Sequence, residues 1–489
     1  MDAGRRNYVA GQWVSCTGER TYARENPAAP ARLIGHFPDS SPDDARLAAR
    51  SASDAFPEWS ARPANARAEV IGAAAALLRE RQDKIAAVLT AEEGKPLTRA
   101  RAEIGRAAEA LGYFAQSALR AAGDTIPSTR PGVVLSVRTE PIGPFLAITP
   151  FNFPAFVTAL KLGPALASGN TVVWKPSPYT PLTSIAVTEA FADAGLPAGV
   201  LNLVLGGSAE LGQSLVDEPA IAGISFTGST TVGLEVGRRA AARHARVQQE
   251  MGGKNVLAVA SDCDLRWAAE IACESSFGES GQKCTASGLV VVDKRRGDEF
   301  LAEVEAIMTR MSMGDGAEPG TDIGPLIDRR ALSRASELID RAADEGAAIE
   351  LADRVATSGA AEGGYFFAPL VARLPAGDNV LKHQEAFAPI MALVLADDLL
   401  AESLALVRAS RLGLSASILT DSLSVAHEFA RRVPAGLVGI NLPTTGVEYQ
   451  APFGGWNNSG GPFPEAGPRA FEFYTRTKTV AVSGGAQPT

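Results

Sequence analysis

The chain has 489 residues, about three times the ~150 residues of a typical single core, so we expect more than one domain and exclude a small binding module. Hydrophobic residues make up 46% of the chain and charged residues 21%, a composition that excludes a disordered protein. The net charge of −9 gives no electrostatic basis for binding nucleic acid or an anionic membrane surface.

The cysteines are few and widely spaced, at positions 16, 263, 273 and 284. None forms a C-x-x-C pair, which argues against a disulfide scaffold and against a zinc site, so we expect no metal and a reducing, cytoplasmic location. The first 16 residues contain no apolar run that would serve as a secretory leader. The most apolar stretch, residues 141–174, is interrupted by prolines, asparagines and a lysine, so we expect no membrane span.

Residues 41–119 are Ala-rich with helical periodicity, and Ser41, Pro42 and Asp44 suit the N-cap, N1 and N3 positions of a first helix. We therefore expect helices to begin the fold. From residue 143 onward, short apolar runs alternate with helical stretches, which predicts βαβ units and a parallel sheet. The predicted strands are 145–149, 170–175, 200–206 and 222–229, with helices at 156–169, 182–194 and 234–242.

A second α/β unit is predicted to start near Gly252, with strands at 255–260 and 287–292, a helix at 267–277 and further helix and strand through 381–441. Residues 314–324 and the Gly-rich segment 355–366 are predicted to be surface loops. Residues 133–141 and 472–482 are rich in β-branched residues and are predicted to be strands outside the main sheets. Appended strands of this kind often form oligomer contacts.

Cys284 lies in GESGQKCTASG, and a free cysteine is most often an inert buried thiol. The flanking glycines and the adjacent Lys283 instead favour an accessible, electropositive setting that lowers the thiol pKa. We therefore interpret Cys284 as a candidate nucleophile.

Two further side chains are candidates for acid–base and oxyanion chemistry. Glu250 precedes Gly252 and Gly253 and is either a general base with a raised pKa or a surface glutamate at a helix end. Asn152, in TPFNFP, is either an oxyanion donor or an asparagine that caps a turn.

A dinucleotide site is indicated by Gly228 and Gly233 in ISFTGSTTVG, between a predicted strand and helix, where backbone N–H groups suit a pyrophosphate. The spacing is not G-x-G-x-x-G, and a plain turn is the alternative. Lys175 ends a predicted strand at its carboxyl end, where ligands bind in open α/β sheets, although a solvated lysine is equally compatible with this position.

Seven short motifs occur along the chain in this order: TPFNFP, NTVVWKPSPYTP, FTGSTTVG, EMGGK, GQKCTA, QEAFAPI and APFGG. They resemble the motifs of the aldehyde dehydrogenase superfamily, and the resemblance extends over nearly the whole chain. The interval between Glu250 and Cys284 is also similar to the family's. The resemblance implies Cys284 as nucleophile, Glu250 as general base, Asn152 as oxyanion donor and Lys161 as a proton relay. It implies these NAD(P)-binding residues: Thr149, Pro150, Lys175, Ser177, Gly228, Ser229, Gly233, Glu385 and Phe387.

The implied reaction is oxidation of an aldehyde to the acid through a cysteine thiohemiacetal and thioester. The implied α/β fold has a Rossmann-like NAD(P)-binding domain (1–122 and 142–251) and an α/β catalytic domain (252–455). Bridging strands (123–141 and 470–489) are expected to make a homodimer or homotetramer. Two rivals stay open: a CoA-acylating semialdehyde dehydrogenase, which as a rule lacks the base at Glu250, and a catalytically silent member of the fold.

Four positions depart from the family pattern. Pro178 stands where NAD-preferring members often have a glutamate, so we expect NADP to be accepted as well as NAD. Ala388 replaces a glycine, and Asn457 and Pro464 replace a lysine and an arginine. The motifs are most similar to members that act on α-ketoglutarate semialdehyde, for whose distal carboxylate Lys283 is a candidate cation. Succinate semialdehyde, aromatic aldehydes and longer aliphatic aldehydes remain open.

Overall fold

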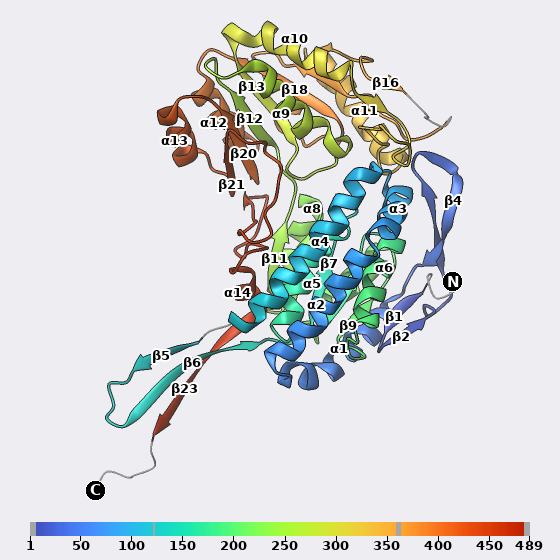
Figure 1. The fold of residues 1–489 in the computed structure, drawn as a ribbon, viewed down its shortest axis with the longest axis vertical. Coiled ribbons are helices and arrows are strands. Elements are labelled where there is room, and N and C mark those ends of the chain that lie inside the picture. The colour runs from blue at the N-terminus through green and yellow to red at the C-terminus, as the bar shows by residue number, and fades with distance from the viewer. Residues whose placement is uncertain (1–5, 121–122, 358–362, 484–489) are drawn as a thin grey trace.

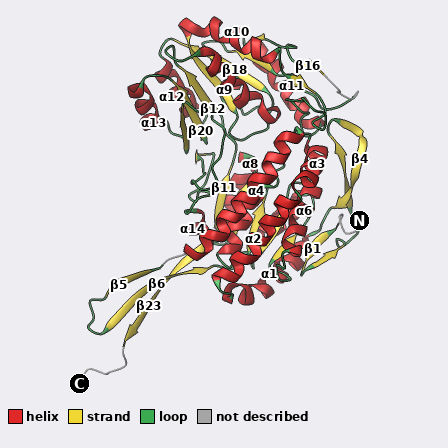
Figure 2. Ribbon diagram, viewed as in Figure 1, coloured by secondary structure: helices red, strands yellow, loops and turns green. Residues whose placement is uncertain are grey.

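The computed structural model describes residues 6–120, 123–357 and 363–483. Within them, the strands build two seven-stranded sheets and a three-stranded sheet, besides three two-stranded pairs. Each large sheet forms the centre of a lobe, and the three-stranded sheet projects from the lobe that contains α1–α6 (Figure 1). Helices lie on both sides of the strands (Figure 2), so the chain has the expected α/β fold.

The first sheet has the strand order β11-β10-β7-β8-β9-β1-β2. Its parallel strands are β7 (Phe145–Ile148), β8 (Val172–Lys175), β9 (Leu201–Leu203), β10 (Gly223–Thr227) and β11 (Arg246–Glu250). The antiparallel pair β1 (Asn7–Val9) and β2 (Gln12–Val14) extends one edge. The expectation that helices begin the fold is wrong, because this pair and the hairpin of β3 (Thr21–Asn26) and β4 (Ala29–Pro38) come first.

Both faces of this sheet are covered. Phe145 and Ala147 of β7 belong to the core under one set of helices, and Leu146 belongs to the core on the opposite face, as the two-residue repeat of a strand requires. The first set is α2 (Ala64–Glu80), α3 (Gln82–Glu93), α4 (Leu97–Ser117), α5 (Phe156–Ala167) and α6 (Pro181–Asp193). The second is α1 (Pro42–Ala61), α7 (Ala209–Asp217) and α8 (Thr230–Ala242).

The predicted start of the first long helix is confirmed. Ser41 is the N-cap of α1, its hydroxyl accepts from the Asp44 N–H, and the Asp44 carboxylate accepts from the Ser41 N–H at 2.7 Å. This reciprocal capping satisfies two N–H groups that the helix cannot pair internally.

The second sheet has the order β15-β17-β18-β13-β12-β20-β21. Its strands are β12 (Asn255–Val259), β13 (Ser287–Asp293), β15 (Ala348–Glu350), β17 (Leu370–Arg373), β18 (Ile390–Ala396), β20 (Ser415–Leu419) and β21 (Leu437–Ile440). The central strands are buried on both faces, which explains their continuous apolar sequence. The surrounding helices are α9 (Leu265–Phe277), α10 (Gly297–Met308), α11 (Arg329–Asp344), α12 (Leu399–Ala409) and α13 (Leu423–Arg432).

The two predicted outlying strands are confirmed. β6 (Val133–Pro141) pairs with β23 (Thr475–Ser483) along nine residues and with β5 (Asp124–Pro127) on its other edge, all antiparallel. Ile126, Val134 and Val482 are exposed on this sheet. Short elements complete the fold: β14 (Ser312–Met313), β16 (Ala356–Thr357), β19 (Leu412–Gly413), β22 (Trp456–Asn457) and α14 (Ala470–Tyr474).

The predicted loop 314–324 holds only turns and isolated bridges, but Ile323 within it is fully buried. Of the loop predicted at 355–366, residues 358–362 lie outside the described residues. All four cysteines lie within the described residues and are free. In the same residues, no helix combines the length and apolar character needed to cross a membrane. The expected domain boundaries stay a prediction.

Candidate active site

The candidate residues gather where the carboxyl ends of the first sheet meet the amino ends of the second. Glu250 is the last residue of β11, and two glycines lead from it toward β12. Cys284 lies in the turn between the short helix η3 (Gly278–Gly281) and β13. Glu385 and Phe387 lie in the loop before β18. The two sheets thus present their ends to one shared region.

The first sheet has a topological switch point between β7 and β10. The chain runs from β7 through β8 to β9 in one direction, and β10 then pairs with the opposite edge of β7. Ligands of open α/β sheets bind beyond the carboxyl ends of strands at such a point. Thr149 and Pro150 follow β7, Gly228 and Ser229 follow β10, and Lys175 ends the adjacent β8.

Cys284 is partly exposed and packs against the edge of the first core. Its carbonyl oxygen accepts from Asn255 Nδ2 at 2.8 Å, which fixes the turn. Burial raises the pKa of the thiol, and the charges of three nearby carboxylates raise it further; these are Glu250, Glu385 and Glu465. The surroundings of the sulfur are therefore electronegative.

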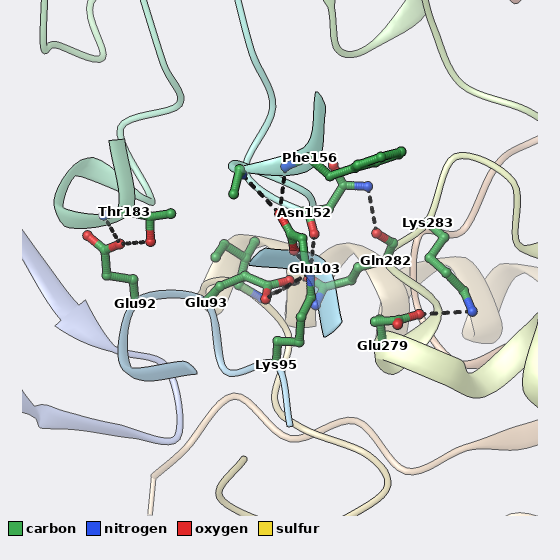
Figure 3. A network of polar contacts seen from close by, with 12 residues as sticks. Glu92, Glu93, Lys95, Glu103, Asn152, Phe156, Thr183, Glu279, Gln282 and Lys283 are labelled. Carbon is green, nitrogen blue, oxygen red and sulfur yellow. Dashed lines mark hydrogen bonds and ion pairs between the residues drawn. The ribbon is translucent and has the colours of Figure 1, made fainter. Parts of the chain in front are cut away.

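The expectation that Lys283 lowers the Cys284 thiol pKa is wrong. Lys283 is buried, and its Nζ lies 3.0 Å from Glu279 Oε2 and donates to the Glu274 carbonyl at 3.1 Å. Adjacent residues in a turn point in different directions, and this lysine neutralises Glu279 instead (Figure 3). Since its ammonium is already paired, Lys283 is also a poor candidate for a substrate carboxylate.

Glu250 is buried at the end of a strand, so the alternative of a surface glutamate at a helix end is wrong. Its Oε1 accepts from the Gly455 N–H at 3.1 Å, and Oε2 has no hydrogen-bond partner among the described residues. Burial raises the pKa of this carboxyl well above its usual range, the charge of Glu465 adds to the rise, and the Gly455 N–H and Lys161 oppose it. A raised pKa makes the carboxylate a stronger base than an exposed glutamate.

Glu465 was missed by the sequence analysis. It lies in a Pro-rich segment with no periodicity, and its backbone pairs with Phe453 in an antiparallel bridge. Its Oε1 forms an ion pair with the buried Lys161 and accepts from Thr227 Oγ1 at 3.3 Å, while its Oε2 has no partner among the described residues. Lys161 also donates to Ser225 Oγ at 2.9 Å. The signal in the sequence that could have pointed to Glu465 was a single carboxylate in a segment rich in glycine and proline.

Asn152 reaches toward the cysteine turn from the other lobe. Its Nδ2 donates to the carbonyl of Gln282 at 2.8 Å, two residues before Cys284 (Figure 3). The side chain does not cap its own turn, which disfavours the alternative of a capping asparagine. The amide therefore lies beside the cysteine turn, where an oxyanion donor is needed.

A buried ion pair lies beneath Asn152 (Figure 3). Lys95 Nζ donates to the Asn152 carbonyl and to Glu103 Oε2, at 2.5 Å each, and Glu103 Oε1 accepts the N–H groups of Ala155 (2.9 Å) and Phe156 (3.2 Å). Glu93 Oε2 is 3.8 Å from Lys95 Nζ, and burial raises the pKa of Glu93 to about 8. The pair thus holds both ends of the turn that carries Asn152.

The residues expected to bind a dinucleotide include two ionisable groups with weak partners. Lys175 Nζ has the carbonyl of Pro176 as its partner, at 3.5 Å, and burial lowers its pKa to about 8. Glu385 Oε1 accepts from the Gly253 N–H at 3.2 Å, and burial raises its pKa to about 7. Such groups fit a ligand that brings hydroxyl partners, as the ribose groups of a dinucleotide do.

The other expected cofactor residues have structural partners as well. Ser229 caps α8, and a Cβ at Gly233 would lie 2.4 Å from Met251 Sδ, so the glycine lets this helix approach the end of β11. Thr149 Oγ1 accepts from Trp174 Nε1 at 2.9 Å. Ser177 Oγ accepts from the Tyr179 N–H at 3.3 Å and forms a turn.

Phe387 has a left-handed backbone with φ 51° and meets Phe151 edge to face at 5.9 Å. Of the departures from the family pattern, Asn457 pairs with Leu412 in β22, and the carbonyl of Pro464 accepts from Gln248 Nε2 at 2.8 Å. Ala388 is buried.

The α/β fold, with a topological switch point in the first sheet and a free cysteine near a buried carboxyl, is that of an oxidoreductase of the dinucleotide-dependent class. A family model described as "Aldehyde dehydrogenase family" matches residues 13–480. The chain therefore belongs to the aldehyde dehydrogenase family and is an aldehyde dehydrogenase.

Known relatives agree over the full length. The α-ketoglutarate semialdehyde dehydrogenase of Haloferax volcanii is 38% identical over 479 residues, which are 97% of this chain and 98% of the relative. The crystal structure of an NADP-dependent enzyme of E. coli has a TM-score of 0.93 and 34% identity, with 99% of each chain covered. An NAD-dependent aldehyde dehydrogenase from Sinorhizobium meliloti has a TM-score of 0.94 and 30% identity, with 99% of this chain and 96% of that chain covered. Homologues thus use NAD or NADP.

Proposed function

We propose that this aldehyde dehydrogenase oxidises a semialdehyde to the corresponding acid, with Cys284 as nucleophile and Glu250 as general base. The observation that carries the proposal is the buried Glu250 carboxyl, whose Oε2 is unpaired among the described residues and whose charge acts on the Cys284 thiol. Neither a structural thiol nor a structural carboxylate requires this arrangement. The ion pair of Glu465 and Lys161 acts on the same carboxyl, because the charge of Glu465 raises the Glu250 pKa and that of Lys161 lowers it.

The first step is proton transfer from the Cys284 thiol to Glu250, as Sγ attacks the aldehyde carbon. Because both groups have raised pKa values, the proton is passed during attack and no thiolate persists beforehand. The carbonyl oxygen becomes an oxyanion that accepts hydrogen bonds from Asn152 Nδ2 and from the Cys284 N–H. Each such donor is typically worth about 3–4 kcal/mol.

Collapse of the thiohemiacetal re-forms the carbonyl and leaves a thioester on Cys284. A bound dinucleotide supplies the acceptor for the hydride that leaves in this step. Glu250 first releases to solvent the proton that it took from the thiol and then removes a proton from water. The resulting hydroxide attacks the thioester carbon, and the C–S bond breaks with the sulfur leaving as a thiolate that takes its proton from Glu250. The acid departs and the sulfur regains a proton, which restores the resting thiol.

For the substrate we propose α-ketoglutarate semialdehyde, the substrate named for the Haloferax volcanii relative. For the cofactor we propose both NAD and NADP, because Pro178 places no carboxylate beside Lys175.

We further propose a homodimer or homotetramer, since the projecting sheet exposes Ile126, Val134 and Val482. Light scattering on the purified chain gives the number of copies, and a monomer would contradict this assembly.

The nucleophile is tested by Cys284→Ala, with Cys16→Ala as the matched control, because Cys16 is a buried thiol that donates to the Arg20 carbonyl. We expect Cys284→Ala to lose aldehyde-dependent reduction of NAD or NADP and Cys16→Ala to keep it. Activity that survives Cys284→Ala would refute the assignment. A wild-type chain that oxidises no semialdehyde would favour the alternative of a catalytically silent member of the fold.

The base is tested by Glu250→Gln. We expect hydride transfer to lose its rapid first turnover and the steady-state rate to fall, because no carboxylate is left to take the proton of the thiol during attack or the proton of water during thioester hydrolysis. Adding CoA to the wild-type enzyme distinguishes the acylating rival: accumulation of acyl-CoA in place of free acid would contradict the proposed hydrolysis.

A further inference from the structure

A cavity of about 530 Å³ lies beside the loop that follows β8. Its lining includes Pro178 and Gly207 from the first lobe, Asp39 from the segment before α1 and Arg330 from α11 of the second lobe. Pro178 packs closely on Gly207, where a Cβ would meet the proline ring at 3.3 Å. The cavity is therefore next to Lys175, on the side where position 178 has no carboxylate.

Arg330 is held at this cavity by contacts between the lobes. The phenol of Tyr179 donates to Asp328 Oδ2 at 2.5 Å, and Asp328 is the N-cap of α11. Arg24 donates to the carbonyls of Tyr179 (2.9 Å) and Ile327 (3.2 Å). These bonds fix the first turn of α11, which carries Arg330, against the loop after β8.

The guanidinium of Arg330 is uncommitted. Its side chain is exposed, and in the described part of the chain it forms no ion pair and no hydrogen bond. Its charge nevertheless reaches the Tyr179 phenol and opposes the rise of that pKa. Arginine is the preferred partner of phosphate, because its planar group donates two parallel hydrogen bonds.

Asp39 supplies the opposite charge. Its Oδ1 accepts from the Gly207 N–H at 3.2 Å, which orients the carboxylate in the cavity wall. Its charge also acts on Lys175, whose lowered pKa it partly restores. A carboxylate beside the adenosine ribose of a bound dinucleotide can accept a hydrogen bond from a 2′-hydroxyl and repels a 2′-phosphate.

We propose that Arg330 and Asp39, which both line this cavity, set the cofactor preference with opposite effects: Arg330 binds the 2′-phosphate of NADP, and Asp39 favours the 2′-hydroxyl of NAD. The inference rests on the proposed use of both dinucleotides. It assigns to Arg330, in the second lobe, a role in binding the adenosine end of the dinucleotide.

The test measures binding to the full-length enzyme without aldehyde, by calorimetry with NADP and with NAD. Arg330→Gln is compared with Arg334→Gln, an exposed arginine one turn further along α11. We expect Arg330→Gln to raise the Kd for NADP tenfold or more, a factor equivalent to about 1.4 kcal/mol. The Kd for NAD should change less than twofold, and Arg334→Gln should change neither.

Asp39→Asn tests the opposing charge and should tighten NADP while weakening NAD. A Kd for NADP that is the same in wild type and Arg330→Gln would overturn this proposal and leave dual cofactor use intact. A wild-type enzyme that binds NAD but not NADP would refute dual use itself, and this proposal with it. An equal weakening of both dinucleotides by Arg330→Gln would show a structural effect and also overturn it.

Discussion

Replacing Glu103 by glutamine tests which carboxylate neutralises the buried Lys95 ammonium beneath Asn152. Glutamine keeps an oxygen for the N–H groups of Ala155 and Phe156 but removes the charge that faces Lys95 at 2.5 Å. Lys95 then has Glu93, 3.8 Å away, as its nearest carboxyl. The burial of Lys95 makes an unpaired ammonium there costly, about 3–5 kcal/mol, so the variant must ionise Glu93.

The cost of that ionisation depends on pH. Burial raises the pKa of Glu93 to about 8, so ionising it costs about 2.7 kcal/mol at pH 6, about 1.4 kcal/mol at pH 7 and almost nothing at pH 9, at ~1.36 kcal/mol per pH unit. A raised carboxyl pKa stabilises the wild type at low pH, and this contribution is lost as the pH rises through about 8. The stability deficit of Glu103→Gln should therefore shrink from pH 6 to pH 9. These costs are upper bounds, because removing the Glu103 charge also lowers the pKa of Glu93.

Urea denaturation of wild type and variant at pH 6, 7, 8 and 9 measures the deficit. The matched control is Glu93→Gln combined with Glu103→Gln, in which Lys95 keeps neither carboxylate. Measured against Glu93→Gln alone, this double variant should show a larger deficit that lacks the pH dependence contributed by Glu93. A single-variant deficit that is constant across the range, or that grows with pH, would refute the reasoning.

Two further outcomes concern the reacting groups. In Glu465→Gln, loss of the charge that raises the pKa of Glu250 and Cys284 should move the rising limb of kcat/KM against pH to lower pH. A limb that stays in place or moves upward would contradict this. In Asn152→Ala, kcat should fall about 10²–10³-fold through loss of one oxyanion donor, while the Kd for NAD from calorimetry stays unchanged. An unaltered kcat would exclude the amide from that role.

Much of the fold follows from local patterns. The apolar runs that became β7, β8 and β10 and the reciprocal cap at Ser41 are short-range features, and each element formed where the sequence predicted it. The N-terminal strands were missed because β1 and β2 are only three residues long and β1 gains its place by pairing with the distant β9. Pairing between segments far apart in sequence leaves little local signal.

The candidate site, like the fold, has residues that local sequence could predict and residues that it could not. Cys284, Glu250 and Asn152 could be selected from motifs, because each lies in a glycine- or proline-rich turn of distinctive composition. The direction of Lys283 and the role of Glu465 could not, since both depend on which buried charge faces them: Glu279 in one case and Lys161 in the other. Electrostatic partners of this kind are set by tertiary packing, which explains why the expected thiol environment had the wrong sign.

Arg24 has a consequence for the rigidity of the molecule. Its guanidinium donates to main-chain carbonyls from three distant segments, at Glu92, Tyr179 and Ile327. Pulling these segments apart would strand three buried acceptors, at about 1–3 kcal/mol each. This one side chain therefore ties the three segments together, and hinging of the lobes on this side of the molecule would break all three hydrogen bonds.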